Sequence, residues 1–452
     1  MTEISIVVPV HNENKNIKPF LQRTENILDK MEKSYEIIFA LDPSSDNTEE
    51  IILDEIKRNK NIKLLFKIFK KDNEETRFVG GCIRDLIIKK KENYDVDLAT
   101  TLKPNEIIKI LKKKKIKIIK SGFSHGTVIA ILNKEKFEIT TLRKDIKTDG
   151  RHAKVKFTKD WITDSNRRDF TINAMSCDFN GNLYDYHVGV KDLKEGRIKF
   201  IGDPKKRIKE DFLRILRYFR FYAYYGKKNI DNSQINVFNN LSSNLKKLSS
   251  ERVYSEFKQI LLSDNLYKVI KLMENSGVLK YIIFNNNNVE KIKSLNKLNK
   301  INYLIDFSTR LAILLNKKNV SRVSKNLKLS KTENIKIKKI IQLHKDFNLK
   351  DFEKNKIKYI YYHGHEICVS LLIYNFAKFP INSKVKIYLR NISSIKNLKV
   401  PKLPIFGKDI INLGIKPGPN VGKILRSIES WWVTNNFKPS RKKCLEKLKE
   451  FS

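Results

Sequence analysis

The feature of this sequence that most constrains its fold is a change in the spacing of its apolar residues. Between residues 66 and 191, short runs with strand-like spacing alternate with short helical stretches. From residue 192 onward the apolar spacing is helical nearly throughout. The sequence therefore predicts an α+β fold, in which a head with a mixed β-sheet and helices precedes an all-helical remainder.

The N-terminal residues follow a separate pattern of alternating elements. We expect strands over residues 4–9, 35–41 and 62–65, and helices over residues 14–31 and 47–59. This order predicts a βαβαβ fragment, which is half of a sheet with helices covering it.

Length and charge limit the class of protein. A chain of 452 residues is too long for one core and suggests about two to four domains. Its 92 Lys and Arg residues against 50 Asp and Glu give a formal net charge of +42. Such an excess favours a polyanionic partner, because basic side chains release counterions from a phosphate backbone. A coding bias toward Lys and Asn is the alternative source of this charge.

Other bulk features exclude several classes of protein. The four Cys residues lack the spacing of metal ligands, which argues against a disulfide scaffold or a zinc module. The N-terminus does not read as a signal peptide, and no apolar run approaches the roughly 20 residues that span a bilayer. We therefore expect a cytoplasmic protein that does not enter a membrane.

The first motif is a turn of two glycines between a strand and a helix. The sequence Phe-Val-Gly-Gly-Cys-Ile-Arg-Asp begins at Phe78, and a helix is expected from about Cys82. Gly80 and Gly81 lack side chains, so a triphosphate could approach their backbone N–H groups at the start of the helix. Arg84 could then pair with phosphate oxygens. An ordinary turn is the alternative.

The second motif places two carboxylates on one strand. Asp95 and Asp97 are two residues apart, so their side chains project from the same face of a strand. Carboxylates held this close repel one another unless a cation lies between them, and their hard oxygens suit Mg²⁺. An exposed edge strand with surface charges is the alternative, which the preceding glycine turn disfavours.

Two further motifs are rich in arginine. Residues 167–175 read Arg-Arg-Asp-Phe-Thr-Ile-Asn-Ala-Met. Asp203 and Pro204 suit the N-cap and first turn of a helix, and we expect the chain to be helical from there. On that helix Asp211 and Arg214 would lie one turn apart on one face. Solvent-exposed ion pairs are the alternative interpretation of these residues.

In this order the motifs resemble those of the nucleotidyltransferase superfamily that includes DNA polymerase β. The resemblance runs from about residue 66 to the C-terminus. Within this superfamily, the motifs resemble those of the class II tRNA nucleotidyltransferases and the bacterial poly(A) polymerases. It implies a polymerase-β-like head in which Asp95 and Asp97 are the catalytic and metal-binding residues, with Mg²⁺ as the cofactor. Two Mg²⁺ ions would activate the attacking 3′-hydroxyl and steady the leaving pyrophosphate.

The same resemblance implies roles for individual residues. Asp169 would accept a hydrogen bond from the ribose hydroxyls, and Glu210, Asp211 and Arg214 would read the base in place of a nucleic-acid template. Glu138 is a candidate for a third carboxylate, with a structural role as the alternative. The residues expected to bind the nucleotide are Gly80, Gly81, Arg84, Arg168, Asp169, Asn173, Glu210, Asp211, Arg214, Arg217 and Arg220.

The expected activity is addition of C, C and A to the 3′ end of tRNA, with tRNA, ATP and CTP as partners. A poly(A) polymerase or an A-adding enzyme is the alternative. Poly(A) polymerases usually carry a Gly-Arg-Arg/Lys-Phe segment, whereas residues 121–128 here read Ser-Gly-Phe-Ser-His-Gly-Thr-Val. Residues 143–151 resemble the flexible loop that enzymes adding only C and C tend to lack, which favours CCA or A addition.

The N-terminal residues resemble another family. The stretches that begin at Ile4 and Leu41 resemble the opening of an inverting, nucleotide-sugar-dependent glycosyltransferase, in which Asp42 would contact the nucleotide. The second half of that site has no counterpart, so we expect a truncated fragment and keep glycosyltransferase activity as a remote alternative. A non-catalytic RNA-binding protein is a further alternative, which the pair of aspartates disfavours.

These expectations divide the chain into five parts. They are a glycosyltransferase-like segment (1–65), a nucleotidyltransferase head (66–191), a helical neck with the base-reading motif (192–264), a helical body (265–399) and a helical tail that binds tRNA (400–452). In the tail, Gly418 and Pro419 form a turn before a helix, where backbone N–H groups could meet tRNA phosphate. A packing turn is the alternative.

Overall fold

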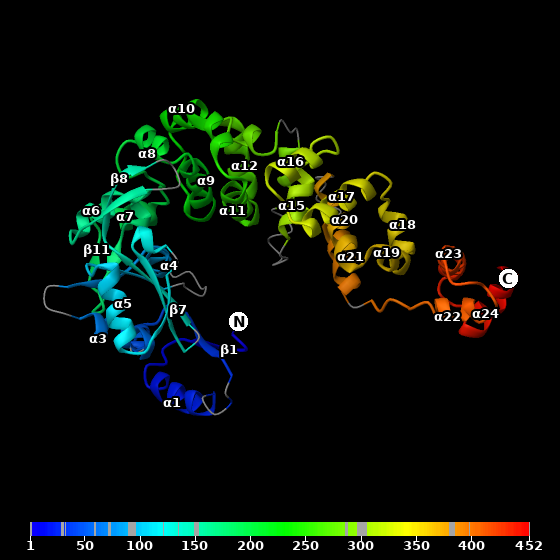
Figure 1. Ribbon diagram of the computed structural model, residues 1–452, viewed down its shortest axis with the longest axis horizontal. Helices are drawn as coiled ribbons and strands as arrows, with labels where there is room; N and C mark the ends of the chain where they lie inside the picture. The colour runs from blue at the N-terminus through cyan, green and yellow to red at the C-terminus, as the bar shows by residue number, and fades with distance from the viewer. Residues whose placement is uncertain are drawn as a thin grey trace. The chain divides into compact units, whose positions relative to one another are not determined.

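The computed structural model divides the chain into two compact units, Met1–Val237 and Phe238–Ser452 (Figure 1). The structure describes residues 2–28, 31, 33–57, 60–70, 74–88, 96–120, 122–133, 135–148, 153–284, 288–295, 305–378, 385–396 and 398–451.

The first unit is built around a seven-stranded mixed sheet with the order β11-β10-β3-β4-β7-β6-β5. Only β4 and β7 pair in parallel; the other neighbours in this sheet are antiparallel. The strands are β3 (Thr76–Val79), β4 (Asp97–Thr100), β5 (Lys117–Ile119), β6 (Thr127–Leu132), β7 (Glu135–Thr141), β10 (Ser176–Cys177) and β11 (Leu183–Tyr184). The mixed sheet confirms the α+β fold expected for the head.

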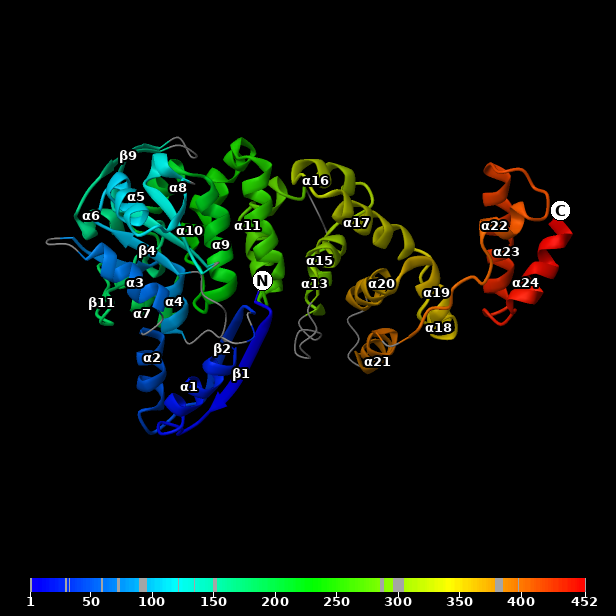
Figure 2. The same cartoon turned by 60° about the horizontal axis from the view of Figure 1, so that its bottom comes forward.

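Two helices, α3 (Lys60–Phe69) and α5 (Pro104–Lys113), share a hydrophobic core with the sheet (Figures 1 and 2). On α3, Ile62, Leu65 and Phe69 are buried in that core. The ring of Phe66 lies 4.9 Å from that of Phe78 on β3. Since buried apolar area is the main favourable contribution to folding, α3 is part of the head.

The N-terminal fragment differs from the prediction. β1 (Ile4–Val10) and β2 (Tyr35–Leu41) form a separate two-stranded parallel sheet, accompanied by α1 (Ile17–Leu28) and α2 (Thr48–Lys57). The prediction of a third strand in a βαβαβ fragment is wrong, because residues 62–65 lie within α3.

The physical reason lies in the spacing of the buried residues. Positions 62, 65 and 69 recur at helical intervals and face the core of the head, whereas a short apolar run alone does not distinguish a strand from a helix. The boundary drawn between residues 65 and 66 therefore falls inside α3. The other domain boundaries stay predictions.

The remaining elements of the first unit are mostly helices. They are α4 (Gly81–Ile87), α6 (Trp161–Asn166), α7 (Gly189–Glu195), α8 (Pro204–Glu210), α9 (Leu213–Tyr225) and most of α10 (Asn232–Leu241). The expected flexible loop over residues 143–151 begins instead as β8 (Arg143–Thr148), which pairs with β9 (Ala153–Phe157). Residues 149–152, between these strands, lie outside the described residues.

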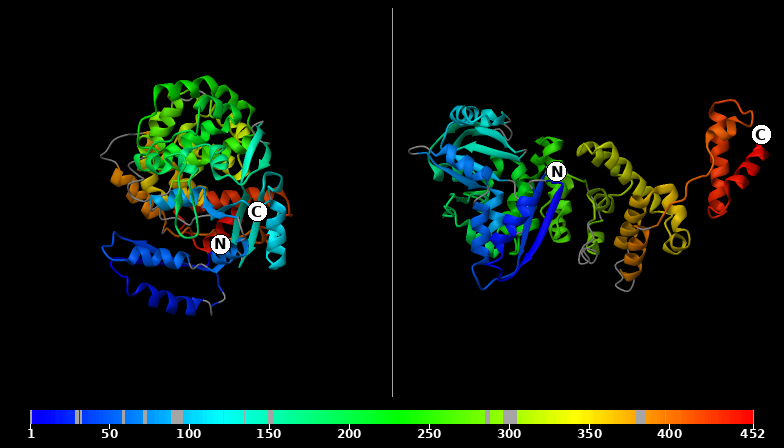
Figure 3. Two further views of the ribbon diagram at one scale, coloured as in Figure 1. Left: turned by 90° about the vertical axis from the view of Figure 1, so that its left-hand side faces the viewer. Right: turned by 90° about the horizontal axis from the view of Figure 1, so that it is seen from below.

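The second unit is helical throughout its described part, as expected (Figure 3). Its helices are α11 (Ser250–Leu262), α12 (Leu266–Asn275), α13 (Val289–Ile292), α15 (Phe307–Leu314), α16 (Val320–Asn326), α17 (Lys331–Leu343), α18 (Leu349–Lys354), α19 (Lys356–His363), α20 (His365–Lys378), α21 (Val385–Lys396), α22 (Gly407–Ile411), α23 (Pro419–Thr434) and α24 (Arg441–Leu448). In the tail Trp432 is buried against Ile405, Ile410 and Ile428. Within the described residues no helix is long and apolar enough to cross a membrane.

A pair of adjacent leucines tests whether α3 belongs to the head. Leu65 is fully buried, whereas Leu64 is 38% exposed. Leu65→Ala should lower the free energy of unfolding by about 2–5 kcal/mol, because it leaves a cavity in the core. The control, Leu64→Ala, should change it by less than about 1 kcal/mol. Urea unfolding measures both values. Equal effects would show that α3 is not part of the core.

Candidate nucleotide and metal site

The site begins where β3 turns into α4 beside the start of β4. Asp97, the first residue of β4, is the register partner of Val79 on β3. Gly80 follows with a φ of 77°, a conformation that favours glycine. A Cβ atom at Gly80 would lie 3.5 Å from Asp97 Oδ2, so this carboxylate lies against the glycine turn. The structure thus brings the first motif and the second aspartate together.

The neighbouring strand adds a further carboxylate. In the parallel pairing of β4 with β7, Asp97 is the register partner of Glu138, and partners on neighbouring strands share one face of a sheet. Glu138 is exposed. The other predicted metal ligand, Asp95, lies outside the described residues. Among the residues that are described, no group of three or more His, Cys, Asp or Glu side chains could hold a metal ion.

This donor set is nevertheless compatible with Mg²⁺. Magnesium is usually bound by one or two carboxylates together with substrate phosphates, and does not need a cage made only of protein atoms. Asp97 offers hard oxygen atoms beside a turn that can admit a phosphate chain. Asp97 therefore fits a magnesium ion that arrives with a nucleotide, with Glu138 on the adjacent strand.

Arg84 on α4 lies inside the protein. Its side chain donates two hydrogen bonds to Asp85, from Nε to Oδ1 (2.8 Å) and from Nη2 to Oδ2 (3.1 Å), and Nη1 donates to Asn173 Oδ1 (2.8 Å). The guanidinium also lies over the rings of Tyr225 and Phe221. It is therefore held by neighbouring side chains on several sides, and its expected role with phosphate stays a prediction.

The Arg-Arg-Asp motif centres on the buried carboxylate of Asp169. Its Oδ1 accepts hydrogen bonds from the backbone N–H of Phe170 (2.9 Å) and from Asn173 Nδ2 (3.1 Å). Its Oδ2 accepts from Arg217 Nε (2.6 Å) on α9. Burial is the largest influence and raises the pKa of Asp169, but Arg217, Asn173 and Arg214 together lower it below its ordinary value. Asp169 is thus held as an anion.

The residues after Asp169 are fixed by a close backbone approach. The short 3₁₀ turn η3 (Thr171–Asn173) packs against the start of α7, and a Cβ atom at Gly189 would lie 2.3 Å from the Thr171 carbonyl oxygen. Thr171 Oγ1 also donates to Asp192 Oδ2 (2.8 Å). Only glycine fits at position 189, a requirement that the sequence reasoning missed.

Asp164 on α6 is a second residue that the sequence reasoning missed. Its buried carboxylate accepts hydrogen bonds from Arg167 Nε (2.8 Å), Arg168 Nη2 (3.4 Å) and the backbone N–H of Arg143 (3.0 Å). Arg168 Nη1 also donates to the Asn173 carbonyl oxygen (3.1 Å). The spacing of Asp164 from the two following arginines, i+3 and i+4, could have identified it.

Arg143, the first residue of β8, is itself partly buried. Burial is the main influence on its guanidinium and lowers its pKa to about 10. Its charge lies between Asp145 on the same strand, at 3.8 Å, and Asp164. Asp164 therefore connects the β8–β9 hairpin to the Arg-Arg-Asp motif.

The base-reading motif does not lie on one continuous helix. The chain leaves the helical conformation at Asp211, whose φ of −154° and ψ of 108° are those of an extended residue. Asp211 Oδ1 accepts a hydrogen bond from the backbone N–H of Leu213 (3.1 Å), so Asp211 ends α8 and caps the start of α9. The predicted uninterrupted helix from Pro204 is therefore wrong, because the Asp211 side chain supplies the local hydrogen bond.

The arginines of this motif are held by carboxylates. Glu210 Oε2 accepts from Arg214 Nη1 (2.5 Å) and from Arg207 Nη1 (2.6 Å). Arg207 also donates to the carbonyl oxygens of Arg167 and Arg168, a contact that the sequence reasoning did not foresee. Glu210 therefore holds the guanidinium groups of both Arg207 and Arg214.

Arg217 and Arg220 follow Arg214 along α9. Besides its bond to Asp169, Arg217 lies with its Cζ 5.3 Å from the Phe221 ring centroid, and Arg220 lies 4.3 Å from the same centroid. Arg217, Arg220 and Arg214 are all partly exposed. The helix thus presents positive charge that a triphosphate could meet.

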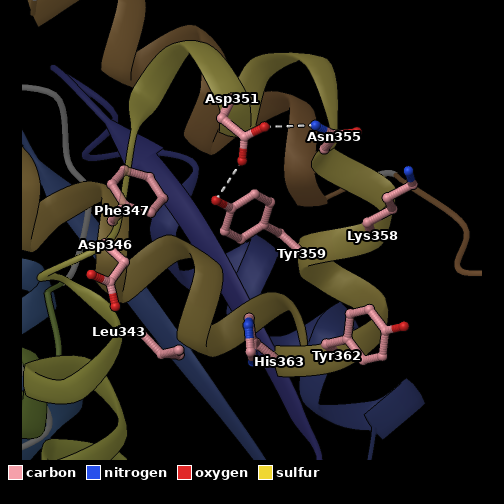
Figure 4. Close-up of a pocket in the computed structure, with 9 residues that line it drawn as sticks. All are labelled: Leu343, Asp346, Phe347, Asp351, Asn355, Lys358, Tyr359, Tyr362 and His363. Atoms are coloured by element: carbon pink, nitrogen blue, oxygen red, sulfur yellow. Dashed lines mark hydrogen bonds between the residues drawn. The ribbon is translucent and has the colours of Figure 1, made fainter. Parts of the chain in front are cut away.

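A separate hollow of about 380 Å³ lies in the second unit, between the end of α17 and α19 (Figure 4). Its rim carries Asp346 and Lys358, and Asp351 accepts hydrogen bonds from Tyr359 Oη (2.8 Å) and Asn355 Nδ2 (2.8 Å). None of the motif residues lines it. The two carboxylates make it a poor place for a polyanion.

Four family models match successive stretches of the chain. A model of the poly A polymerase head domain matches residues 76–199, and one of the probable RNA- and SrmB-binding site of polymerase A matches residues 229–284. A model of a tRNA nucleotidyltransferase domain 2 matches residues 306–448. A glycosyl transferase family 2 model matches residues 5–72, which confirms the resemblance of the N-terminal segment.

The chain is also similar, over most of its length, to CCA-adding enzymes. The chain is 33% identical over 402 residues to the mitochondrial CCA tRNA nucleotidyltransferase 1 of Mus musculus, covering 86% of this chain and 90% of the relative. It is 32% identical over 380 residues to the CCA-adding enzyme of Staphylococcus epidermidis, covering 82% and 92%. The crystal structure of the Bacillus stearothermophilus CCA-adding enzyme in complex with CTP has a similar fold, with a TM-score of 0.68, 23% identity and coverage of 85% and 95%.

The contacts of Asp164 generate a prediction about stability and its pH dependence. Burial is the largest influence and raises the pKa of this carboxyl group, but the charges of Arg167 and Arg168 lower it overall. A lowered pKa in the folded state stabilises the fold above the unfolded value of about 4, and this stabilisation is lost as the pH falls. Asp164→Asn should therefore lower the free energy of unfolding by about 3 kcal/mol at pH 7 and by less at pH 3.

Urea unfolding at the two pH values measures this difference. Asp264→Asn is the control, because Asp264 is exposed and should have no effect at either pH. A constant deficit for Asp164→Asn across the pH range would contradict the assignment of an ionised, paired carboxylate.

Proposed function

Because this chain belongs to the family of CCA-adding tRNA nucleotidyltransferases, we propose that it adds C, C and A to the 3′ end of tRNA from CTP and ATP and releases pyrophosphate. The observation that carries this proposal is the position of the Asp97 carboxylate against the Gly80 turn. The same unit contains Asp169, which accepts a hydrogen bond from Arg217, and Glu210, which accepts one from Arg214.

The metal site fits the chemistry of the transfer. We assign Mg²⁺ to Asp97 and Asp95, with Glu138 as the neighbouring carboxylate. When bound, Mg²⁺ lowers the pKa of the attacking 3′-hydroxyl and neutralises the charge that develops on the pyrophosphate. The glycine turn offers backbone N–H groups at the start of α4, where they can bind the triphosphate.

Sugar selection is assigned to Asp169. Its Oδ1 already accepts two hydrogen bonds, from Phe170 and Asn173, whereas Oδ2 accepts one from Arg217. A carboxylate oxygen accepts two hydrogen bonds readily, so Oδ2 keeps capacity for a ribose hydroxyl. A deoxyribonucleotide lacks the 2′-hydroxyl that could fill this position.

Base selection is assigned to Asp211 and Arg214. Cytosine presents a donor at N4 beside an acceptor at N3, and adenine presents a donor at N6 beside an acceptor at N1. One acceptor and one donor from the protein can therefore pair with both bases. Uracil and guanine present the opposite order and would leave both protein groups unpaired. Glu210 holds the Arg214 guanidinium in place for this task.

The compartment and the exact product stay predictions. The sequence favours a cytoplasmic protein, whereas relatives from Mus musculus, Homo sapiens and Danio rerio are described as mitochondrial. An enzyme that adds only A is the alternative product specificity, and the experiment below distinguishes it.

The function is tested with a tRNA that ends at the discriminator base. The protein is incubated with CTP, ATP or both, and the 3′ ends are sequenced. CC should appear with CTP alone and CCA with both nucleotides. Asp97→Ala should lower the rate by about 10³-fold or more, because metal activation is lost, while tRNA binding stays nearly intact. Asp264→Ala is the control. Absence of addition by the wild-type protein would overturn the function.

Nucleotide selectivity tests the base-reading assignment. Arg214→Ala and Asp211→Ala should each slow the addition of C and A. They should also relax the rejection of UTP and GTP, which we expect to be about 10²-fold or greater in the wild type. Lys209→Ala, an exposed position on α8, is the matched control. The measurement is incorporation of each of the four nucleotides. Unchanged selectivity in either variant would mean that this residue serves only the local structure where α8 meets α9 and does not read the base.

A further inference from the structure

The residue after Arg84 forms a contact that the proposed mechanism does not use. Asp85 Oδ1 accepts a hydrogen bond from the Tyr225 hydroxyl group (2.7 Å), in addition to those from Arg84. Tyr225 is the last residue of α9 and is only 8% exposed. Its ring lies 4.5 Å from Arg84 Cζ, so the same tyrosine contacts both residues of the pair.

This contact joins two ends of the nucleotide site. Arg84 and Asp85 lie on α4, which begins at the glycine turn beside Asp97. Tyr225 lies on α9, which also carries Arg214. Metal and triphosphate are assigned to the first end, and the base to the second. A nucleotide bound to both must therefore match the distance between them.

A second path links the same two helices. Arg84 Nη1 donates to Asn173, Asn173 donates to Asp169, and Asp169 accepts from Arg217 in the middle of α9. Phe221, between the two attachment points on α9, contacts both Arg84 and Arg217. The helix is thus held along its length: Arg217 fixes its middle, and Tyr225 fixes its last turn.

We propose that Tyr225 is a positioning residue, whose hydrogen bond to Asp85 sets the spacing between the triphosphate end and the base-reading end of the site. This inference rests on the proposed function. Without the hydroxyl group α9 loses its hydrogen bond to Asp85 at this end, and Arg214 can shift relative to Asp97. Since misplacement by about 1 Å can cost up to about 10²-fold in rate, even a small shift affects the chemistry.

The same helix offers a matched control. Tyr222 is also buried, and its hydroxyl donates to the carbonyl oxygen of Lys228 (2.9 Å), in the turn that follows α9. Tyr222→Phe and Tyr225→Phe each remove one buried hydroxyl group from the same helix, and both should lower Tm by a similar few degrees. The Tyr225 hydroxyl donates to α4, whereas the Tyr222 hydroxyl donates to the turn after α9.

The test measures single-turnover addition of C and A, incorporation of UTP and GTP, and the KM for tRNA in both variants. Tyr225→Phe should slow correct addition by about 10-fold and raise the share of wrong nucleotides, with the KM for tRNA unchanged. Tyr222→Phe should keep the rate and selectivity of the wild type.

Two results would overturn the inference while leaving the function intact. One is a Tyr225→Phe protein with the rate and selectivity of the wild type. The other is an equal loss in both variants, which would reflect only the stability of α9. A wild-type protein that adds no nucleotide would instead remove the proposed function, and this inference with it.

Discussion

The site depends on one buried carboxylate, that of Asp169. It accepts hydrogen bonds from its own segment through Phe170 and Asn173, and from α9 through Arg217. Burying a charge is costly unless it is paired and hydrogen-bonded, so these contacts offset the cost of burying this carboxylate. Asp169 therefore links its own segment to α9, the helix that carries Arg214.

Two further carboxylates pair with the arginines of these motifs and neutralise only part of their positive charge. Asp164 holds Arg167 and Arg168, while Glu210 holds Arg207 and Arg214. Each carboxylate fixes the positions of two guanidinium groups, which leaves a net positive charge and donors whose direction is set before a ligand arrives. Donors that are already fixed lose less conformational entropy when a ligand binds. A triphosphate could therefore bind without rearrangement of these side chains.

Much of this arrangement could be predicted from the sequence, and the exceptions have physical causes. The glycine turn, the aspartate strand and the arginine motifs lie on local segments whose spacing is informative. The break at Asp211 depends on a side chain that bonds to its own backbone, and no Gly or Pro marks it. Asp164 also accepts a hydrogen bond from Arg143 on β8, and this contact between distant segments leaves no local pattern.

The junction between the two resemblances shows how packing decides where a segment belongs. The glycosyl transferase family 2 match extends to residue 72, yet Ile62, Leu65 and Phe69 are buried in the core of the nucleotidyltransferase head. The β1–β2 sheet precedes α3, and its buried residue Val10 packs with Ile17 on α1 and Ile52 on α2. Because the buried side chains of α3 lie in the core of the head, α3 belongs to the head.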